Sequence, residues 1–292
     1  MDKGSDEIET VVVITHFNDP RIYDAVDSIK KQSLKPDRII VADGGSPSEY
    51  KEKLQDIVDF QTMFGRCIDT RRQVISYLKK DKEKKIIVFL DSDMVALNNW
   101  LINLTVPIAK GDADFTGGKI LYKPSKNDFE RVLNIINCKN QELLSKDVSY
   151  IPMGNSAWHM KIFDKIGSFD DSSVSNKTDK DYLKGNIKGS YHVSDDYDIN
   201  IRAIQAGFKG KYIDNAVVYH NQSHINTYKK LVSYFYRQYV RTSMAYFKHK
   251  MGISKFTKGS KTTVVHPFEL FLFILKPIAL IHGWKEWMKV AK

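Results

Sequence analysis

A run of five apolar residues leads directly into two aspartates in the first third of the chain, from Ile86 to Asp93 (Ile-Ile-Val-Phe-Leu-Asp-Ser-Asp). Such an unbroken run is typical of a strand inside a parallel sheet that is covered on both faces. Ligands of open α/β sheets lie at the carboxyl ends of the strands, so we expect Asp91 and Asp93 at the ligand-binding edge. Paired carboxylates suit Mg²⁺ or Mn²⁺ shared with substrate phosphates. The alternative is a polar turn with an incidental aspartate pair.

Two earlier segments indicate more strands of the same sheet. Thr10 to Thr15 is β-branched throughout and ends in a loop rich in turn residues. A short amphipathic helix follows, and then Arg38 to Ala42 forms a strand closed by the turn Asp43-Gly-Gly-Ser. The succession of strand, helix and strand implies right-handed βαβ units and a parallel sheet. Asp43 is therefore a second carboxylate expected at the ligand-binding edge.

The middle of the chain contains weaker signals. We expect helix and loop from Lys51 to Leu78, a solvated turn from Lys79 to Lys85 and a surface loop from Ser172 to Ser194. A helix from Trp100, a strand with a glycine break from Phe115 to Leu121, a loop from Gly154 to Trp158 followed by a short helix, and a last strand from Lys211 to Tyr219 complete the expected elements.

A helix is predicted to begin at Asp195-Asp196-Tyr197-Asp198 and to stop at Gly207. Aspartates at a helix start commonly cap the helix and interact with its dipole, which accounts for one of the three. Three caps at one helix start are not expected, so part of this acidic cluster is available for chemistry.

The positive charge of the chain is concentrated at its C-terminal end. Residues 226–292 hold 13 Lys/Arg and 2 Asp/Glu, whereas the remainder holds 32 and 33. A nearly neutral body argues against a nucleic-acid groove spread over the fold. The cationic end indicates contact with an anionic surface. We therefore predict a domain of residues 1–225 and a basic helical extension of residues 226–292.

The extension has two parts. Aromatic and aliphatic residues recur at helical spacing from Tyr228 to Phe247, with a basic stripe that is typical of a membrane-surface or partner-binding helix. The alternative is a helix that packs on the core with a solvated basic face. Phe268 to Ile281 is the most apolar stretch, but charged residues and Pro277 interrupt it, so we expect an interfacial segment and no spanning helix.

The compartment is indicated by two further features. Cys67 and Cys138 fit neither a disulfide framework nor a metal-binding spacing, and Met1 to Thr10 lacks the apolar core of a signal peptide. We expect a cytoplasmic protein, peripheral on the inner face of a membrane.

The ordered blocks Val-Val-Val-Ile-Thr-His-Phe-Asn, Asp-Gly-Gly-Ser, Phe-Leu-Asp-Ser-Asp and Asp-Asp-Tyr-Asp resemble the family 2 inverting glycosyltransferases. The resemblance covers roughly residues 8 to 225. It implies the GT-A fold, a Rossmann-like α/β architecture with a mostly parallel sheet flanked by helices. It also implies a metal-dependent, non-processive transfer of sugar from a nucleotide-diphosphate donor, with a UDP-sugar favoured, to a glycan or lipid-linked acceptor in polysaccharide biosynthesis.

The resemblance also assigns roles to residues. The donor site would contain Thr15, Phe17, Asn18, Asp43, Arg71 and Asp91, and the acceptor site would contain Gly154, Asn155 and Trp158. Asp93 and Asp91 would hold Mn²⁺ or Mg²⁺, with His220 completing the metal site and His224 as a weaker candidate. Asp196 or its neighbour Asp195 would be the catalytic base. Arg72 stands where the family usually has an asparagine.

Three alternatives stay open. A sugar nucleotidyltransferase would need a glycine-rich phosphate loop after the first strand, and His16 to Arg21 does not provide one. A degenerate glycan- or nucleotide-binding subunit is disfavoured by the intact Asp93 and Asp196. Binding of nucleic acid through the basic extension would weaken steeply with salt. Gln238-Tyr-Val-Arg241 resembles a motif of processive synthases, but Thr242 follows it in place of tryptophan, so we expect the match to be incidental.

Overall fold

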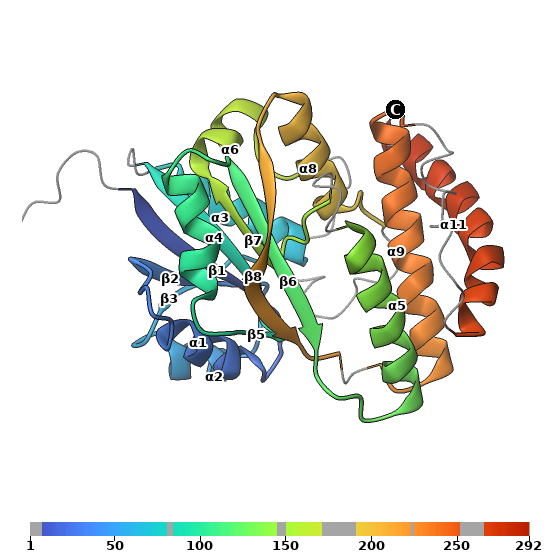
Figure 1. Ribbon diagram of the computed structural model, residues 1–292, viewed down its shortest axis with the longest axis horizontal. Helices are drawn as coiled ribbons and strands as arrows, with labels where there is room; N and C mark the ends of the chain where they lie inside the picture. Colours follow the sequence, from blue (N-terminus) through green and yellow to red (C-terminus); the bar gives the residue numbers. More distant parts are fainter. Residues whose placement is uncertain are drawn as a thin grey trace, which may run out of the picture.

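One eight-stranded sheet forms the centre of the molecule in the computed structural model, which describes residues 8–80, 84–144, 150–170, 191–222, 225–251 and 266–291 (Figure 1). Its strands are β1 (Glu9–His16), β2 (Arg38–Asp43), β3 (Asp59–Thr62), β4 (Lys85–Asp91), β5 (Met94–Ala96), β6 (Phe115–Tyr122), β7 (Asn155–His159) and β8 (Gly210–His220). They are arranged in the order β3-β2-β1-β4-β7-β6-β8-β5.

The first half of the sheet is parallel, as the sequence predicts. Strand β1 pairs in parallel with β2 and β4, and β2 pairs in parallel with β3. The strands are joined by α1 (Ile22–Lys30), α2 (Ser48–Leu54) and α3 (Cys67–Leu78). The apolar run of β4 is at most 1% exposed, which confirms that this strand is buried on both faces.

Alternate residues of the central strands build two cores. Val12 and Ile14 pack on one face with α1 and α4 (Trp100–Ala109), whereas Val11 and Val13 pack on the other face. That second face is covered by α3, α6 (Met160–Ile166) and α8 (Asp195–Gln205). Covering on both faces is what allows strands without a polar side. The cores hold the carboxyl ends of β1, β2 and β4 side by side.

The second half of the sheet is mixed. Strand β7 is antiparallel to β4 and to β6, while β8 is parallel to β6 and antiparallel to β5. The expected glycine break in β6 appears as a register shift between Gly118 and Lys119.

Three short strands correct our expectations. Strands β3 and β5 were not predicted, and Asn155 to Trp158 belongs to strand β7 and not to a loop. Each has at most five residues, and pairing with neighbours distant in sequence decides its conformation more than local propensity does.

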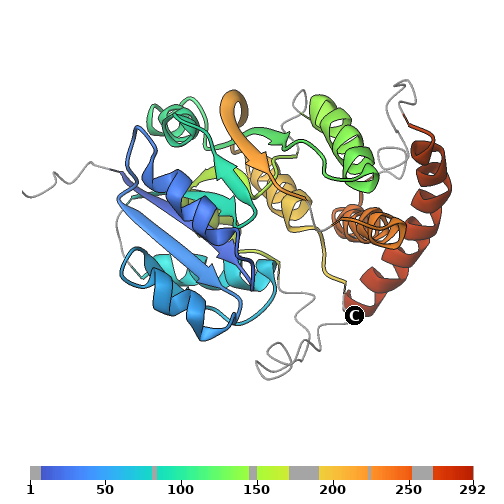
Figure 2. The same cartoon turned by 90° about the horizontal axis from the view of Figure 1, so that it is seen from below.

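Three long helices stand beside the sheet: α5 (Asp128–Leu144), α9 (Tyr228–Lys248) and α11 (Phe268–Val290). Seen from below, α11 lies along the outside of α9, farther from the sheet (Figure 2). The segment that we expected to be broken continues as one 23-residue helix through Pro277. Within the described part of the chain, no helix is long and apolar enough to cross a membrane.

The described boundaries of other elements follow the sequence closely. Helix α8 begins at Asp195, and Gly207 beyond its end has φ 89°, a conformation that glycine adopts readily. Most of the surface loop expected from Ser172 to Ser194, part of the charge run from Lys79 to Lys85, and His224 lie outside the described residues.

Candidate active site

The carboxyl ends of three neighbouring strands carry the polar residues that the sequence places at one edge. In the register of β1 with β4, Thr15 is opposite Asp91, and in that of β1 with β2, His16 is opposite Asp43. The Thr15 hydroxyl donates a hydrogen bond of 2.8 Å to Asp91 Oδ1. Strand pairing alone therefore brings residues 76 positions apart into contact.

Asp91 is held from three sides. Arg71 Nη2 donates to Asp91 Oδ1 at 2.6 Å, in addition to the bond from Thr15. On the third side, a Cβ atom built on Gly154 would lie 2.3 Å from Asp91 Oδ2, so only glycine fits there. Gly154 thus acts by leaving room for the Asp91 carboxylate.

Asp93 lies next to His220 because β5 pairs with the end of β8. His220 Nε2 is 3.0 Å from Asp93 Oδ2, and the backbone N–H of Asn221 donates to the Asp93 carbonyl at 3.0 Å. Burial lowers the pKa of His220, but the charge and hydrogen bond of Asp93 outweigh that effect and raise the pKa above its usual value. Arg21 is also close, with Nη2 3.8 Å from Asp93 Oδ2.

The donor set at this position suits a divalent cation that is shared with a substrate. A carboxylate and an imidazole are accepted ligands of Mn²⁺, and Mg²⁺ is commonly bound through one or two carboxylates and substrate phosphates. The structure brings together two of the three predicted ligands, Asp93 and His220. Among the described residues, no three His, Cys, Asp or Glu side chains gather into a site that could hold a metal by themselves. Asp91 instead pairs with Arg71.

Arg71 links the two acidic regions of the site. Its Nη2 reaches Asp91, and its Nη1 donates to Asp195 Oδ2 at 2.5 Å. Asp195 also accepts a bond of 2.8 Å from Arg241 Nη2, on α9. Burial raises the pKa of Asp195, but the two guanidinium charges outweigh burial and lower it to about 2. Asp195 is therefore ionised and fixed between two arginines.

Asp196 has a different environment one residue later. Its Oδ2 accepts a bond of 3.0 Å from the Tyr150 hydroxyl, and its Oδ1 accepts one of 3.1 Å from the Met153 backbone N–H. Burial raises the pKa of Asp196, and the negative charge of Asp195 raises it further, to about 6. A carboxylate with a raised pKa and neutral donors can accept a proton near neutral pH.

The third aspartate of α8 has a structural role. Asp198 is 1% exposed and pairs with Arg202, Lys248 and His249. Arg202 also donates to the carbonyls of residues 166 and 168 at 2.8 Å. These contacts bind α8 to the C-terminal end of α9 and so position the start of α8.

The remaining donor-site candidates lie in or beside the two loops that follow β1 and β2, at the same sheet edge as Asp91. The Asn18 N–H donates to Ser46 Oγ at 2.7 Å, and Ser46 donates in turn to Asp43. Asp43 is buried and also accepts bonds from two backbone N–H groups of its turn. Phe17 is 46% exposed at the same edge and is available for contact with a flat ring. Recognition of a nucleotide base by these residues stays a prediction.

Two acceptor-site candidates have side chains buried in the core, and their contact with an acceptor stays a prediction. Trp158 is fully buried, stacks on Phe115 with ring centroids 4.5 Å apart, and donates to Ser156 Oγ at 2.8 Å. Asn155 is also fully buried and bonds Trp100 and the Lys119 carbonyl. Their side chains support the sheet beneath the site, because β7 is a strand and not a loop.

Sequence reasoning missed three residues that the structure brings to the site: Arg21, Tyr150 and Arg241. A signal for Arg241 was present, since it ends the Gln-x-x-Arg pattern, but the missing tryptophan led us to regard that match as incidental. No local pattern marks Arg21 or Tyr150, because their partners lie far away in the sequence.

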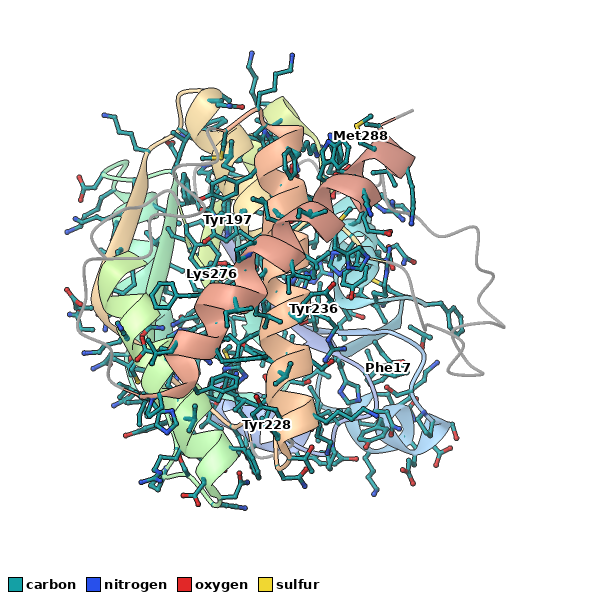
Figure 3. All side chains as sticks on the ribbon, turned by 90° about the vertical axis from the view of Figure 1, so that its right-hand side faces the viewer. Phe17, Tyr197, Tyr228, Tyr236, Lys276 and Met288 are labelled. Atoms are coloured by element: carbon teal, nitrogen blue, oxygen red, sulfur yellow. The ribbon has the colours of Figure 1, made fainter. Side chains whose placement is uncertain are left out.

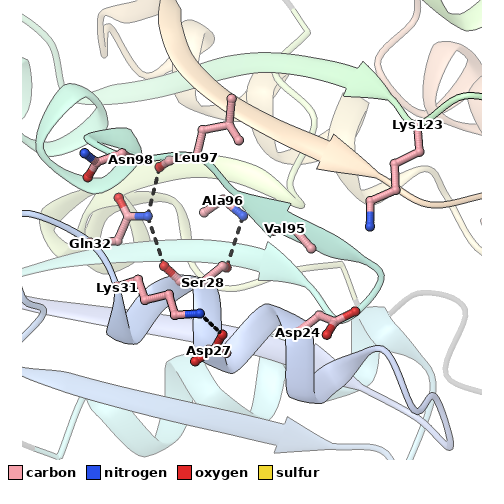
Figure 4. Close-up of a pocket in the computed structure, with 10 residues that line it drawn as sticks. All are labelled: Asp24, Asp27, Ser28, Lys31, Gln32, Val95, Ala96, Leu97, Asn98 and Lys123. Atoms are coloured by element: carbon pink, nitrogen blue, oxygen red, sulfur yellow. Dashed lines mark hydrogen bonds and ion pairs between the residues drawn. The ribbon is translucent and has the colours of Figure 1, made fainter.

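A separate pocket of about 430 Å³ lies between α1 and the segment that follows β5 (Figure 4). Its walls are tied together by the bond from the Ala96 N–H to Ser28 Oγ and by that from Gln32 Nε2 to the Leu97 carbonyl. None of the predicted site residues lines it. We therefore assign it no part in the chemistry.

Comparisons with known proteins identify the family of the chain and agree with its fold. The sequence profile of the family described as "Glycosyl transferase family 2" matches residues 10–167, more than half of the chain. A comparison with curated proteins finds no significant match. The fold is similar to that of a mannosyltransferase, PcManGT from Pyrobaculum calidifontis, solved with GDP-Man and Mn²⁺. That match has a TM-score of 0.56 and 13% identity, and covers 97% of this chain and 75% of the other.

A second solved structure, GalNAc-T7 with UDP, GalNAc and Mn²⁺, has a TM-score of 0.53 and 14% identity. The match covers 97% of this chain and 57% of that one. At such identities the likeness concerns the fold, and the residues at the sheet edge have to be argued from their own contacts.

Proposed function

Because this chain belongs to glycosyl transferase family 2, we propose that it is an inverting, metal-dependent glycosyltransferase that adds one or a few sugars from a nucleotide-diphosphate donor. The observation that carries the proposal is the pairing of two acidic regions at one sheet edge through Arg71. One region is suited to the charged donor and the other to the acceptor proton. We favour a UDP-sugar as the donor and a glycan or a lipid-linked glycan as the acceptor.

Asp93 and His220 are the residues that would hold Mn²⁺ or Mg²⁺. The cation would neutralise charge on the departing diphosphate. Arg21 supports the same assignment, because its guanidinium, held by the Asp19 carboxylate and the Asn221 carbonyl, lies 3.8 Å from the Asp93 carboxylate and adds positive charge where the diphosphate is expected. Thr15, Phe17, Asn18 and Asp43 would contact the nucleoside.

Asp196 is the proposed base. As the acceptor oxygen forms its bond to the anomeric carbon, its hydroxyl proton passes to the Asp196 carboxylate. The bond from that carbon to the diphosphate breaks on the opposite face, and its electron pair leaves with the nucleoside diphosphate. Asp195 keeps its negative charge beside Asp196 and favours proton uptake there, while Arg71 and Arg241 keep Asp195 from taking the proton itself.

We propose that residues 226–292 bring the enzyme to an anionic membrane surface on the cytoplasmic side, where a lipid-linked acceptor would be held. The charge balance of this segment supports the proposal, because lysine and arginine near an anionic leaflet are attracted to it.

The central test is a panel of nucleotide-sugars scored by the release of nucleoside diphosphate, with and without a chelator. We expect release that depends on Mn²⁺ or Mg²⁺, and Asp93→Asn should abolish transfer as the chelator does. A matched control is Asp112→Asn, at an exposed carboxylate remote from the edge. Full activity of Asp93→Asn without added metal would contradict the metal assignment. Binding of donors with no turnover for any sugar would favour a degenerate binding subunit.

A further inference from the structure

The outward face of α11 is unusually apolar for a protein surface. Seven of the twelve large hydrophobic side chains exposed in the described part of the chain lie on this helix. They are Leu270, Phe273, Ile274, Ile278, Ile281, Trp284 and Met288, each between 44% and 65% exposed. Soluble surfaces carry single apolar residues, but a continuous apolar patch of this kind marks an interaction site.

The seven residues follow one another at intervals of one, three or four, so they lie on one side of the helix. The opposite side packs on α9 and α5 through buried residues such as Leu272, Leu275 and Ala279. Helix α11 is thus apolar on both sides, and only one side is covered. Figure 3 shows the helix as the outermost element of this side of the molecule, crossing in front of α9.

The contact of α11 with α9 is close enough to hold that face in place. A Cβ atom on Gly283 would lie 1.7 Å from Ser243 Oγ and 2.7 Å from the Val240 carbonyl, so the two helices approach through a glycine. The hydroxyl of Tyr236 and His282 Nδ1 are 2.8 Å apart, and Lys139 pairs with Glu269 at 2.5 Å. The apolar face is therefore presented on a helix that is fixed to the body.

The extension that contains this face has a net positive charge. The extension holds 13 Lys/Arg and only Glu269 and Glu286 as acidic residues. Both acidic residues already pair with lysines, Glu269 with Lys139 and Glu286 with Lys289. Lys285 is exposed at the end of the helix that carries Trp284. An apolar stripe with lysines and an exposed tryptophan is the pattern of a helix that lies in a membrane interface.

We infer that the outward face of α11 is a membrane-docking surface that lies in the plane of an anionic bilayer, with its seven apolar side chains inserted below the headgroups. Charge complementarity favours a lipid surface over a second copy of this chain, since two such faces would bring like charges together. The inference deepens the membrane contact proposed above by naming the helix, the side and the residues. It does not depend on which sugar is transferred.

The position of α9 connects this surface to the site. Arg241 projects from α9 to Asp195, while Val240 and Ser243 of the same helix contact α11. Two packed helices, α9 and α11, therefore separate the acidic pair from the proposed membrane surface. Packed helix axes are about 8–10 Å apart, so an acceptor anchored in the bilayer would have to extend past both helices to reach the site.

The test is flotation of the full-length protein with phosphatidylcholine vesicles, with and without phosphatidylglycerol, at low and high salt. Point substitutions are preferred to deletion of residues 226–292, because that deletion would also remove Arg241 from the site. We expect binding to anionic vesicles, reduced about tenfold or more by Ile274→Glu combined with Ile281→Glu. The control is Ile57→Glu, at an apolar residue of similar exposure remote from α11, which should bind like wild type. Circular dichroism and release of nucleoside diphosphate in vesicle-free buffer should be unchanged in all three proteins.

Two further measurements sharpen the result. Tryptophan emission should shift to the blue on binding and be quenched by brominated acyl chains, and Trp284→Phe should remove most of that response. Lys285→Glu with Lys289→Glu should weaken binding only to anionic vesicles, whereas Lys51→Glu with Lys80→Glu, two exposed lysines elsewhere, should not. No binding by wild type, or equal binding by the Ile274/Ile281 variant, would overturn the inference. A dimer that the same variant dissociates would assign the face to a second copy. Each of these outcomes leaves the proposed transfer reaction standing, because vesicle binding is measured without donor or acceptor.

Discussion

Asp91 and Asp93 at the end of β4 and Asp195 and Asp196 at the start of α8 form two acidic regions that share one arrangement with different partners. In each region one aspartate is held by arginine: Asp91 by Arg71, and Asp195 by Arg71 and Arg241. The other aspartate differs between the regions. Asp93 faces the imidazole of His220, whereas Asp196 accepts hydrogen bonds from a tyrosine hydroxyl and a backbone N–H.

The difference teaches that the partner, and not the residue type, sets the chemistry of each acid. Asp93, beside the His220 imidazole and near the Arg21 guanidinium, suits a metal or phosphate environment. A carboxylate beside a like charge and neutral donors has its pKa raised, to about 6 for Asp196. The arginine-held aspartates keep both environments in place. We therefore expect substitutions in the two regions to have separable effects on donor binding and on turnover.

The largest expected effect separates the two regions directly. Asp196→Asn should lower turnover by about 10²–10⁴ and leave donor affinity near wild type, because a positioned base acts only in the transfer step. Turnover and donor affinity are measured by nucleoside diphosphate release and by calorimetry. A larger loss of turnover in Asp195→Asn, with donor affinity intact, would exchange the two roles.

The next effect concerns the residue that joins the regions. Arg71→Met leaves the buried Asp195 and the partly buried Asp91 without their shared cation, which should cost about 3–5 kcal/mol of unfolding free energy. Arg241→Met should cost less, because Arg241 pairs with only one of these carboxylates and its side chain is 24% exposed. Urea denaturation gives both values. Equal losses would mean that Arg71 does not bridge the two regions in solution.

The smallest effect is a shift in pH dependence. Turnover should fall as the pH drops through about 6, since Asp196 acts as a base only when it is ionised. The positive charge of Arg241 lowers the pKa of Asp196, so Arg241→Met should move this limb to higher pH, by less than about one unit. Arg237→Met, on the exposed side of the same helix, is the matched control. If the acidic limb of the pH profile of turnover did not move in Arg241→Met, the charge of Arg241 would have no effect on the pKa of the base.

Much of the site could be predicted from the sequence because its residues adjoin strong local patterns. Asp91 and Asp93 follow an apolar run, Asp43 begins a glycine turn, and Asp195 and Asp196 open a helix with a clear glycine stop. The parallel half of the sheet follows from the same runs. These signals extend over a few consecutive residues, so one sequence suffices to read them.

The missed features depend on partners that are distant in the chain. Arg71 and Arg241 meet at Asp195, although 170 positions separate them, and no spacing encodes that contact. Strand β7 contains the polar residues Asn155 and Ser156, which made this segment look like a loop in the sequence. Both side chains are buried and form hydrogen bonds within the core, so the segment can be a strand. The continuity of α11 through Pro277 depends on packing against α9, which outweighs the local preference to break.

Helix α9 contacts the candidate site on one side and α11 on the other, and these contacts restrict how its sequence can vary. Arg241 is committed to the site, Lys248 and His249 to Asp198, and Val240 and Ser243 to α11. Only a stripe that includes Lys229, Lys230 and Arg237 is exposed to solvent. Substitutions of α9 outside that stripe would therefore disturb the site, the start of α8 or the packing of α11. Engineering of this protein should accordingly change α9 and α11 together, as one packed unit.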